Sequence, residues 1–389
     1  MKKIKSFLFA AVAIALTAPV FTSCGDDGDK GVETIEKIVE NMVSEYTYND
    51  NLVAETKAKS GKNEAVLLVA FGSTWDNSFK AFDKTVEAYK TKFPNADVYM
   101  SFSSDICINR ASQGENYDDE GKNLVKRDYY EPRYLLHAIG KAQYGKITVQ
   151  SLQVIPGEEF AAVVAAVKKF MNNGYIASAH LDDTYLKNLQ ETDGIKMGMP
   201  LLYDPAEDVP DVAQRLYNLF SSEANDGVVA FMGHGNPDTY DTFKANVRYT
   251  ELEDELQKLN PKFYVGTVDM ADNYKQDVKD RMVVDGKTSG KVYLHALMSI
   301  AGDHAHNDMA GGALEGQTEG AYWDESDPES EDNSWFEYFK HSGYDVTVPI
   351  VGKHPQGLLE LETIREVWIN HTSNAQSFED AYHSMYPEE

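Results

Sequence analysis

Histidines and carboxylates gather in two glycine-containing segments of this chain. His234 lies in a Gly-His-Gly triplet at 233–235, and His304 lies in residues 302–308, which hold two histidines and two aspartates. Imidazole binds borderline divalent metals and exchanges protons near neutral pH. A lone histidine such as His234 is in most proteins a turn residue, and residues 302–308 could also form a structural cation site or a hydrogen-bonded helix start. The density of titratable groups in 302–308 favours metal binding or proton transfer.

A carboxylate joins these histidines through an internal match between two halves of the chain. Residues 146–159 resemble residues 291–304, since each is an apolar run that breaks at a glycine and ends in polar residues. In this match Glu159 takes the place of His304. A pseudo-twofold relation between the halves would bring Glu159, His234 and His304 into one cleft. Two imidazoles and one carboxylate, with positions left open, suit a borderline divalent metal that must also be released.

The elements that position these residues are eight short apolar runs, which alternate with helical patterns. We expect strands at 65–71, 97–102, 147–153 and 195–202, and again at 227–232, 262–268, 291–300 and 344–351. Helical patterns include 158–171, 209–219 and 250–259. Such alternation is typical of parallel sheets covered by helices. The expected fold class is α/β, with two similar lobes, each a parallel four-stranded sheet flanked by helices, related by a pseudo-twofold.

Residues that follow the strands are candidates for ligand contact, because ligands of open α/β sheets sit beyond the carboxyl ends of the strands. We expect His234, Glu159 and His304 to be the metal-binding and catalytic residues. The same rule gives residues expected to contact the bound ligand, namely Ser73, Gly233, Gly235, Gly302 and Asp303. His306 and Asp308 are expected to orient or cap this segment, and His295, inside an apolar run, to lie in the core or a pocket wall.

The N-terminus predicts export. Three lysines precede an apolar run at 7–20 that is too short to span a bilayer, and the run leads to Cys24 and an acidic stretch. This pattern is typical of a signal peptide over 1–23, with Cys24 lipidated after cleavage. Ordinary secretion with an incidental Cys24 is the alternative. We expect a lipid-anchored protein outside the cytoplasm, periplasmic or at the outer membrane.

The remaining chain divides into a tether and two lobes. Residues 24–62 are expected to form an acidic tether, an amphipathic helix over 35–43 and a polar linker. The lobes are expected at 63–223 and 224–389, the second with an acidic insert at 311–332 that is either a flap over the cleft or a solvated loop. Only two cysteines occur. If Cys24 carries lipid, Cys107 has no partner for a disulfide, and we expect it to be a buried, inert thiol.

The charge balance excludes one class of partner. The chain has 36 basic and 63 acidic residues, a net charge of −27. Loss of the three lysines of the signal peptide leaves 33 basic and 63 acidic residues, or −30. Binding to nucleic acid through phosphates needs a basic face, and none is visible. No nucleic-acid partner is expected.

Six segments, in order, resemble the cobaltochelatases of the anaerobic cobalamin pathway, which belong with the ferrochelatases among the metal-inserting chelatases. They are residues 67–74, 150–160, 198–202, 229–235, 265–269 and 297–310. Ala-Gly-Asp-His-Ala at 301–305, followed by Asn-Asp-Met, is the most specific. The metal-binding residues of that family fall on His234, Glu159 and His304. The resemblance implies two lobes clasping a tetrapyrrole, no nucleotide cofactor, and Co²⁺ or Fe²⁺ as a substrate.

The resemblance implies a sirohydrochlorin cobaltochelatase-type lyase, which inserts the metal into a sirohydrochlorin- or porphyrin-type ring. Gln153 stands where the family has a histidine. The expected localisation outside the cytoplasm instead favours a lipoprotein that captures haem or another tetrapyrrole for uptake or metal removal. A solute-binding lipoprotein would explain the anchor and lobes, but it gives no role to residues 302–308. We expect the chelatase, and the sequence leaves the metal preference and a homo-oligomeric state open.

Overall fold

The computed structural model describes residues 35–117, 125–314 and 322–387. The expected signal peptide, Cys24 and most of the acidic tether therefore lie outside the described residues, as do residues 315–321 of the acidic insert. Across the described ranges, no helix combines the length and the apolar character needed to cross a membrane.

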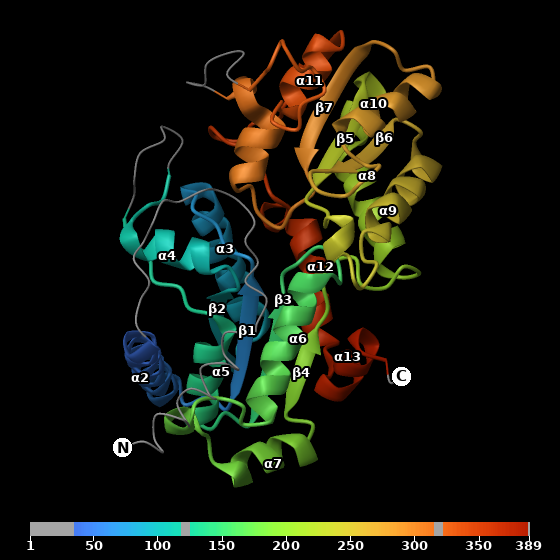
Figure 1. Ribbon diagram of the computed structural model, residues 1–389. Helices are drawn as coiled ribbons and strands as arrows, with labels where there is room; N and C mark the ends of the chain where they lie inside the picture. Colours follow the sequence, from blue (N-terminus) through green and yellow to red (C-terminus); the bar gives the residue numbers. More distant parts are fainter. Residues whose placement is uncertain (1–34, 118–124, 315–321, 388–389) are drawn as a thin grey trace.

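Two parallel sheets of matching strand order form the framework (Figure 1). The first has the order β2-β1-β3-β4-β9, and its strands are β1 (Glu64–Ala70), β2 (Ala96–Phe102), β3 (Lys146–Ser151), β4 (Ile195–Gly198) and β9 (Gln376–Ser377). The second has the order β6-β5-β7-β8, and its strands are β5 (Val228–Gly233), β6 (Phe263–Thr267), β7 (Gly290–Ala296) and β8 (Tyr344–Thr347). The expected α/β fold with two four-stranded parallel sheets is confirmed, and β9 adds an antiparallel edge strand to the first.

Helices connect and cover these strands. In the first lobe they are α2 (Ile35–Ser60), α3 (Asp76–Lys92), α4 (Asp105–Gln113), α5 (Pro132–Lys141), α6 (Glu158–Met171), η1 (Ala177–Ala179) and α7 (Asp183–Glu191). Next along the chain are α8 (Asp208–Asp226), η2 (Asp238–Tyr240), α9 (Val247–Leu259), α10 (Lys275–Val284), η3 (Ala305–Ala310), η4 (Gly311–Ala313), α11 (Trp335–His341) and η5 (Leu358–Glu360). The last two helices are α12 (Glu362–Ser373) and α13 (Phe378–Met385).

Alternate residues of β1 face two different layers, as the period of two in a strand requires. Val66 and Leu68 join the apolar cluster that includes residues of α3 and α12. Leu67 and Val69 join the cluster that includes residues of α5 and α6. Because both faces of β1 are covered, the strand is a continuous apolar run rather than an alternating one.

α2 differs from its expected extent. The sequence suggested a helix over 35–43 followed by a polar linker, but the helix continues to Ser60. Tyr46, Asn49 and Val53 recur at helical spacing and are buried, and α2 packs on α5. Lys57 Nζ also donates hydrogen bonds to the carbonyl oxygens of Ala142 and Gln143, each at 2.8 Å, at the end of α5. A few buried side chains in a polar stretch therefore extend the helix.

The C-terminus returns to the first lobe. β9 pairs with β4, and α12 and α13 contact elements of the first sheet. Figure 1 shows α12 between the lobes and α13 beside α6 and β4. Trp368 Nε1 donates to the carbonyl oxygen of Gln153 at 3.2 Å, and Thr372 Oγ1 to Gln150 Oε1 at 2.7 Å. The expected division, which gave residues 224–389 to the second lobe, thus differs from the observed packing after residue 361.

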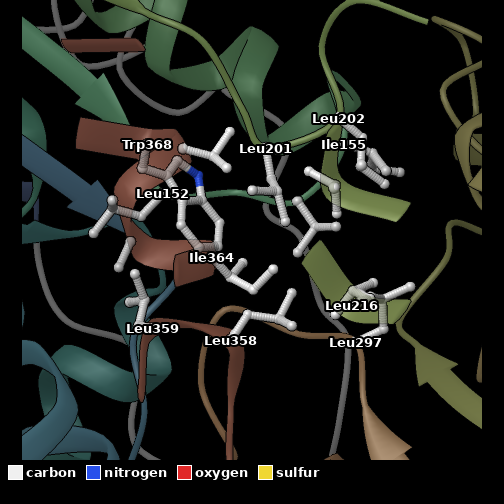
Figure 2. Close-up of a cluster of buried hydrophobic side chains, with 14 of the residues drawn as sticks. Leu152, Ile155, Leu201, Leu202, Leu216, Leu297, Leu358, Leu359, Ile364 and Trp368 are labelled. Carbon is white, nitrogen blue, oxygen red and sulfur yellow. The ribbon is translucent and has the colours of Figure 1, made fainter. Parts of the chain in front are cut away.

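The lobes share one apolar core (Figure 2). Its labelled members are Leu152, Ile155, Leu201, Leu202, Leu216, Leu297, Leu358, Leu359, Ile364 and Trp368. All of them are buried. Full burial of one such side chain is worth about 1.5–3 kcal/mol. The expected strands at 195–202 and 291–300 in fact end at Gly198 and Ala296. Beyond these ends, Leu201, Leu202 and Leu297 are buried in the core between the lobes rather than in a sheet.

Candidate metal centre

His234 directly follows β5 and is fixed by the tight turn around it. Its Nδ1 donates a hydrogen bond to the carbonyl oxygen of Gly235 at 2.7 Å. Gly235 has a φ of +79°, and a Cβ on it would lie 2.8 Å from the backbone nitrogen of Met270. A Cβ on Gly233 would lie 2.5 Å from the ring of Tyr249. The turn therefore needs glycine on both sides of His234.

His304 immediately precedes the π-helical turn η3, a type of turn that is rare and often found at functional sites. Its Nδ1 donates to Asp308 Oδ2 at 2.5 Å. The imidazoles of His234 and His304 are in edge contact, with ring centroids 4.7 Å apart and an interplanar angle of 81°. The structure thus brings together the two predicted histidines from the ends of β5 and β7.

Both histidines donate a hydrogen bond through Nδ1, and this bond determines which ring nitrogen is left to bind a metal. In a neutral ring that donates through Nδ1, Nε2 carries the lone pair, and such an arrangement orients metal-binding histidines. Burial, together with the nearby His304, lowers the pKa of His234. His234 is therefore neutral at neutral pH, the form that can bind a metal.

Glu159 lies in the first turn of α6 and is half-buried as a residue. Burial raises its pKa to about 7, and the charge of His304 opposes part of that rise. The start of α6 abuts the second lobe. A Cβ on Gly157 would lie 3.0 Å from Asn236 Nδ2, and Glu158 Oε1 accepts a hydrogen bond from the backbone nitrogen of Thr242. Glu159 is thus placed at the lobe boundary with a pKa suited to proton transfer.

The predicted residues are neighbours without forming a closed ligand set. Among the side chains in the described ranges, no group of three or more His, Cys, Asp or Glu is arranged to hold a metal ion.

Cys107 is buried, and burial raises the pKa of its thiol to about 11. A protonated thiol is a poor metal ligand, which agrees with the expectation of an inert cysteine.

Asp269 belongs to the same cluster and was given no role from sequence. Asp269 Oδ2 lies 3.7 Å from Nδ1 of His234, and the backbone nitrogen of Asp269 donates to the carbonyl oxygen of His234 at 2.9 Å. Asp269 comes just after β6, so the rule that pointed to His234 also applies to it. The signal was present in the sequence, in the segment 265–269.

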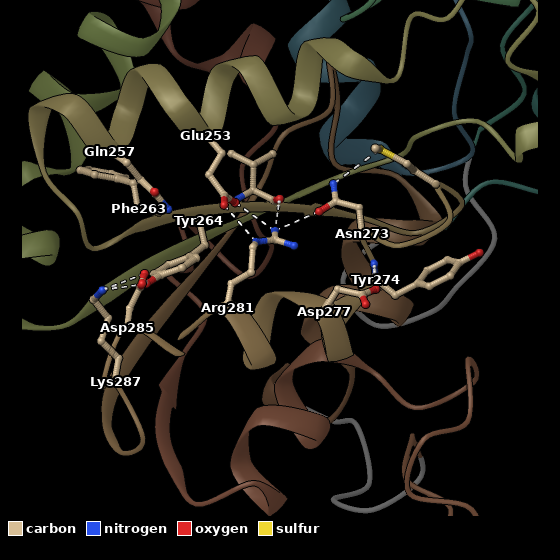
Figure 3. Close-up of polar contacts among 12 residues, drawn as sticks. Glu253, Gln257, Phe263, Tyr264, Asn273, Tyr274, Asp277, Arg281, Asp285 and Lys287 are labelled. Carbon is tan, nitrogen blue, oxygen red and sulfur yellow. Dashed lines mark hydrogen bonds and ion pairs between the residues drawn. The ribbon is translucent and has the colours of Figure 1, made fainter. Parts of the chain in front are cut away.

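A polar network holds the turn that carries Asp269 (Figure 3). The guanidinium of Arg281 lies between Glu253 and Asn273, with Nη2 3.0 Å from Glu253 Oε2 and 2.9 Å from Asn273 Oδ1. Nη2 also donates to the carbonyl oxygen of Val265 at 2.9 Å. The backbone nitrogen of Thr267 donates to the carbonyl oxygen of Asn273 at 2.8 Å, which closes the turn. Arg281 therefore links α9, β6 and the turn after β6.

The residues expected to contact a ligand lie around this cluster. Ser73 is buried, its Oγ accepts from the backbone nitrogen of Trp75 at 3.1 Å, and a Cβ on Gly302 would lie 3.5 Å from that oxygen. Ser73 and Gly302 thus meet across the lobe boundary. Asp303 is exposed and accepts a hydrogen bond from Trp75 Nε1.

The accompanying histidines occupy supporting positions. His306 is buried, and its Nδ1 donates to the carbonyl oxygen of Gly302 at 2.8 Å. His295 Nε2 lies 2.6 Å from Glu223 Oε2 and lines a cavity of about 120 Å³ with Phe220 and Phe231. The expectations of an orienting His306 and a pocket-wall His295 agree with these positions.

The described part of the acidic insert packs on α10. Lys275 Nζ donates to the carbonyl oxygen of Glu331 at 3.2 Å, and Gln276 Nε2 to that of Glu329 at 2.8 Å. Residues 322–332 are thus attached to the second lobe rather than simply solvated.

Comparison with known proteins gives consistent matches. A family model described as cobalt chelatase (CbiK) matches residues 64–377. The sirohydrochlorin cobaltochelatase CbiKC of Nitratidesulfovibrio vulgaris strain Hildenborough is 25% identical over 318 residues, which cover 81% of this chain and 91% of that protein. The sirohydrochlorin cobaltochelatase of Salmonella typhimurium strain LT2 is 26% identical over 249 residues, covering 64% and 80%. A solved structure of SirB from Bacillus subtilis with Fe³⁺ aligns with a TM-score of 0.46 at 12% identity, covering 84% and 98%.

Proposed function

The chain belongs to the CbiK family of cobalt chelatases, and from this premise we propose that it inserts Co²⁺, or Fe²⁺, into a sirohydrochlorin- or porphyrin-type tetrapyrrole. The observation that carries the proposal is the contact between the imidazoles of His234 and His304, each with Nδ1 donated to an acceptor. Two relatives that bear the name sirohydrochlorin cobaltochelatase support the choice of ring.

The proposed site binds the metal before it enters the ring. Nε2 of His234 and Nε2 of His304 are the proposed donors, and Glu159 or Asp269 is the proposed source of an oxygen ligand. A set of two imidazoles and a carboxylate binds Co²⁺ or Fe²⁺ without the thiolates that would retain it. The metal is a substrate here, so moderate affinity is an advantage.

Insertion must also dispose of two protons. The divalent metal replaces the two N–H protons of the ring, so the metallated ring has the same charge and two protons leave. Glu159, whose pKa burial raises to about 7, can accept one of them near neutral pH. The second can pass to a histidine Nε2 as the metal leaves that nitrogen. The same residues thus hold the metal and then take up the protons that it displaces.

We also propose that the protein is a lipoprotein acting outside the cytoplasm, with Cys24 as the lipidated residue. The support is the basic and then apolar sequence before Cys24. Mass spectrometry of the mature N-terminus measures this directly. Acyl chains on Cys24 would support the proposal, and an unmodified residue at a different cleavage site would overturn it.

The test of the activity is a spectral assay of the full-length protein with a metal-free ring. Sirohydrochlorin or a porphyrin is mixed with Co²⁺ or Fe²⁺, and its absorption bands are followed against a control without protein. Conversion of many rings per protein molecule is expected. In a parallel titration, haem is added to the protein. Stoichiometric binding of haem, with no conversion of the metal-free ring, would instead indicate the capture lipoprotein and would overturn the chelatase.

A further inference from the structure

The start of α3, in the first lobe, contacts the second-lobe segment that carries His304. We propose that Trp75 is a positioning residue that holds His304 in place from across the lobe boundary. The inference rests on the proposed function, because it gives Trp75 a role in metal binding at His304.

Trp75 contacts the residues on both sides of His304. Its indole stacks on the imidazole of His306, with ring centroids 3.6 Å apart and an interplanar angle of 11°. Its Nε1 donates a hydrogen bond to Asp303 Oδ1. One side chain of the first lobe therefore contacts the residue before His304 and the second residue after it.

Two neighbours of Trp75 extend the contact. Asn77 Nδ2 and Ser78 Oγ each donate a hydrogen bond of 3.0 Å to the carbonyl oxygen of Ala301. Both side chains are buried, as is Ala301. We call Trp75, Asn77 and Ser78 the α3 clamp. The clamp contacts 301–306 at three residues, none of which is His304 itself.

Trp75 is itself firmly held in the first lobe. The backbone nitrogen of Asp76 donates to the carbonyl oxygen of Tyr117 at 2.8 Å, and the backbone nitrogen of Tyr117 to that of Thr74 at 2.7 Å. The indole also packs near the ring of Tyr117, with centroids 6.0 Å apart. The clamp thus connects a well-anchored turn of one lobe to the ligand-bearing turn of the other.

The segment around His304 needs such support. η3 is a single π-helical turn, a conformation that is rare on its own and is found mostly as a short irregularity at functional sites. A metal ligand must be placed to within about 0.2 Å. If the clamp were lost, 301–310 would keep its own hydrogen bonds and its packing within the second lobe, but it would lose these contacts to the first lobe.

Trp75→Leu removes both the stack and the N–H, while Trp75→Phe keeps a ring for His306 and removes only the N–H. Trp323→Leu is the matched control, because Trp323 stacks on His341 at a centroid distance of 4.0 Å within the second lobe. The full-length variants are compared by Co²⁺ titration calorimetry, by steady-state insertion kinetics and by hydrogen exchange of residues 301–310.

We expect Trp75→Leu to weaken Co²⁺ binding about tenfold or more, as loss of an orienting contact does, and to speed exchange in 301–310. Trp75→Phe should show a smaller loss, and Trp323→Leu none. Unchanged exchange in 301–310, or equal losses in Trp75→Leu and Trp323→Leu, would overturn the inference. Absence of both Co²⁺ binding and turnover in the wild type would instead contradict the proposed function. In that case, the hydrogen-exchange rates of residues 301–310 would still test whether Trp75 holds this segment.

Discussion

At the scale of single residues, His234 and His304 owe their proposed chemistry to what holds their Nδ1 atoms. A backbone carbonyl holds one and Asp308 holds the other, so both rings present Nε2 for binding. Glu159 differs from the two histidines, because burial raises the pKa of its carboxyl group to about 7 and so allows it to take up a proton near neutral pH. Under the proposed function, these environments would assign metal binding to the two histidines and proton uptake to Glu159.

The raised pKa of Glu159 predicts a pH-dependent cost to stability. Its folded pKa of about 7 exceeds the ordinary value of 4.5, so the folded state holds the proton more tightly and ionisation above pH 4.5 increasingly favours unfolding. Glu159→Gln is neutral throughout. We expect its gain in unfolding free energy over the wild type to grow by about 1–3 kcal/mol between pH 5 and pH 8.

Urea denaturation at both pH values measures this gain. Glu115→Gln, at a half-buried position just after α4, serves as the control for a glutamate-to-glutamine change, and the pH-dependent gain of Glu159→Gln should exceed that of the control. A Glu159→Gln variant that is less stable than the wild type at pH 8 would contradict the raised pKa.

At the scale of elements, the rule that ligands sit at strand ends singled out His234 and His304 in the sequence, and the structure brings their rings into contact. Their role as metal ligands stays a prediction. The apolar runs made the strands recognisable in the sequence, and the two sheets have the matching strand order that the internal similarity of the halves suggested. Trp75 could not be found this way, since its partners lie more than 220 residues away. The return of the C-terminus to β4 was also invisible, because the two-residue strand β9 has no periodicity to detect.

Arg281 should be the main support of the turn that carries Asp269. Glu253, 8% exposed, loses its charged partner in Arg281→Met, and removing one member of a buried pair costs about 3–5 kcal/mol. We expect a loss at the low end of this range, because Arg281 itself is partly exposed. Guanidinium-induced unfolding measures the change.

Lys258→Met is the control for Arg281→Met. Lys258 pairs with Glu255 on the same helix as Glu253, at an exposed position, where such a pair is worth about 0–1 kcal/mol. If the two variants lost equal stability, Arg281 would have no special role in the turn.

At the scale of the whole molecule, the lobes are joined by an apolar core instead of a hinge. Leu152 and Leu201 come from the first lobe, Leu297 from the second, and Trp368 from the returning α12. An extensive apolar interface between two lobes resists their relative motion. The candidate site should therefore admit its substrates without wide opening of the lobes.

The shared core predicts that both lobes unfold together. Leu358 is fully buried in it, and Leu358→Ala should cost about 2–5 kcal/mol while preserving a single transition. Far-UV circular dichroism and tryptophan fluorescence should give coincident curves. Val284→Ala, at an exposed position, should change stability by less than about 0.5 kcal/mol. Two separate transitions, with only one shifted by Leu358→Ala, would show that the lobes are independent.

The most direct test of the account is the initial rate of Co²⁺ insertion by His234→Ala and His304→Ala. His383→Ala, an exposed histidine in α13, is the control, and unfolding midpoints verify that each variant is folded. We predict that each of the two alanine variants loses about 100-fold or more in rate, while the control retains the wild-type rate. Wild-type turnover in a folded His234→Ala or His304→Ala variant would contradict the proposed metal centre.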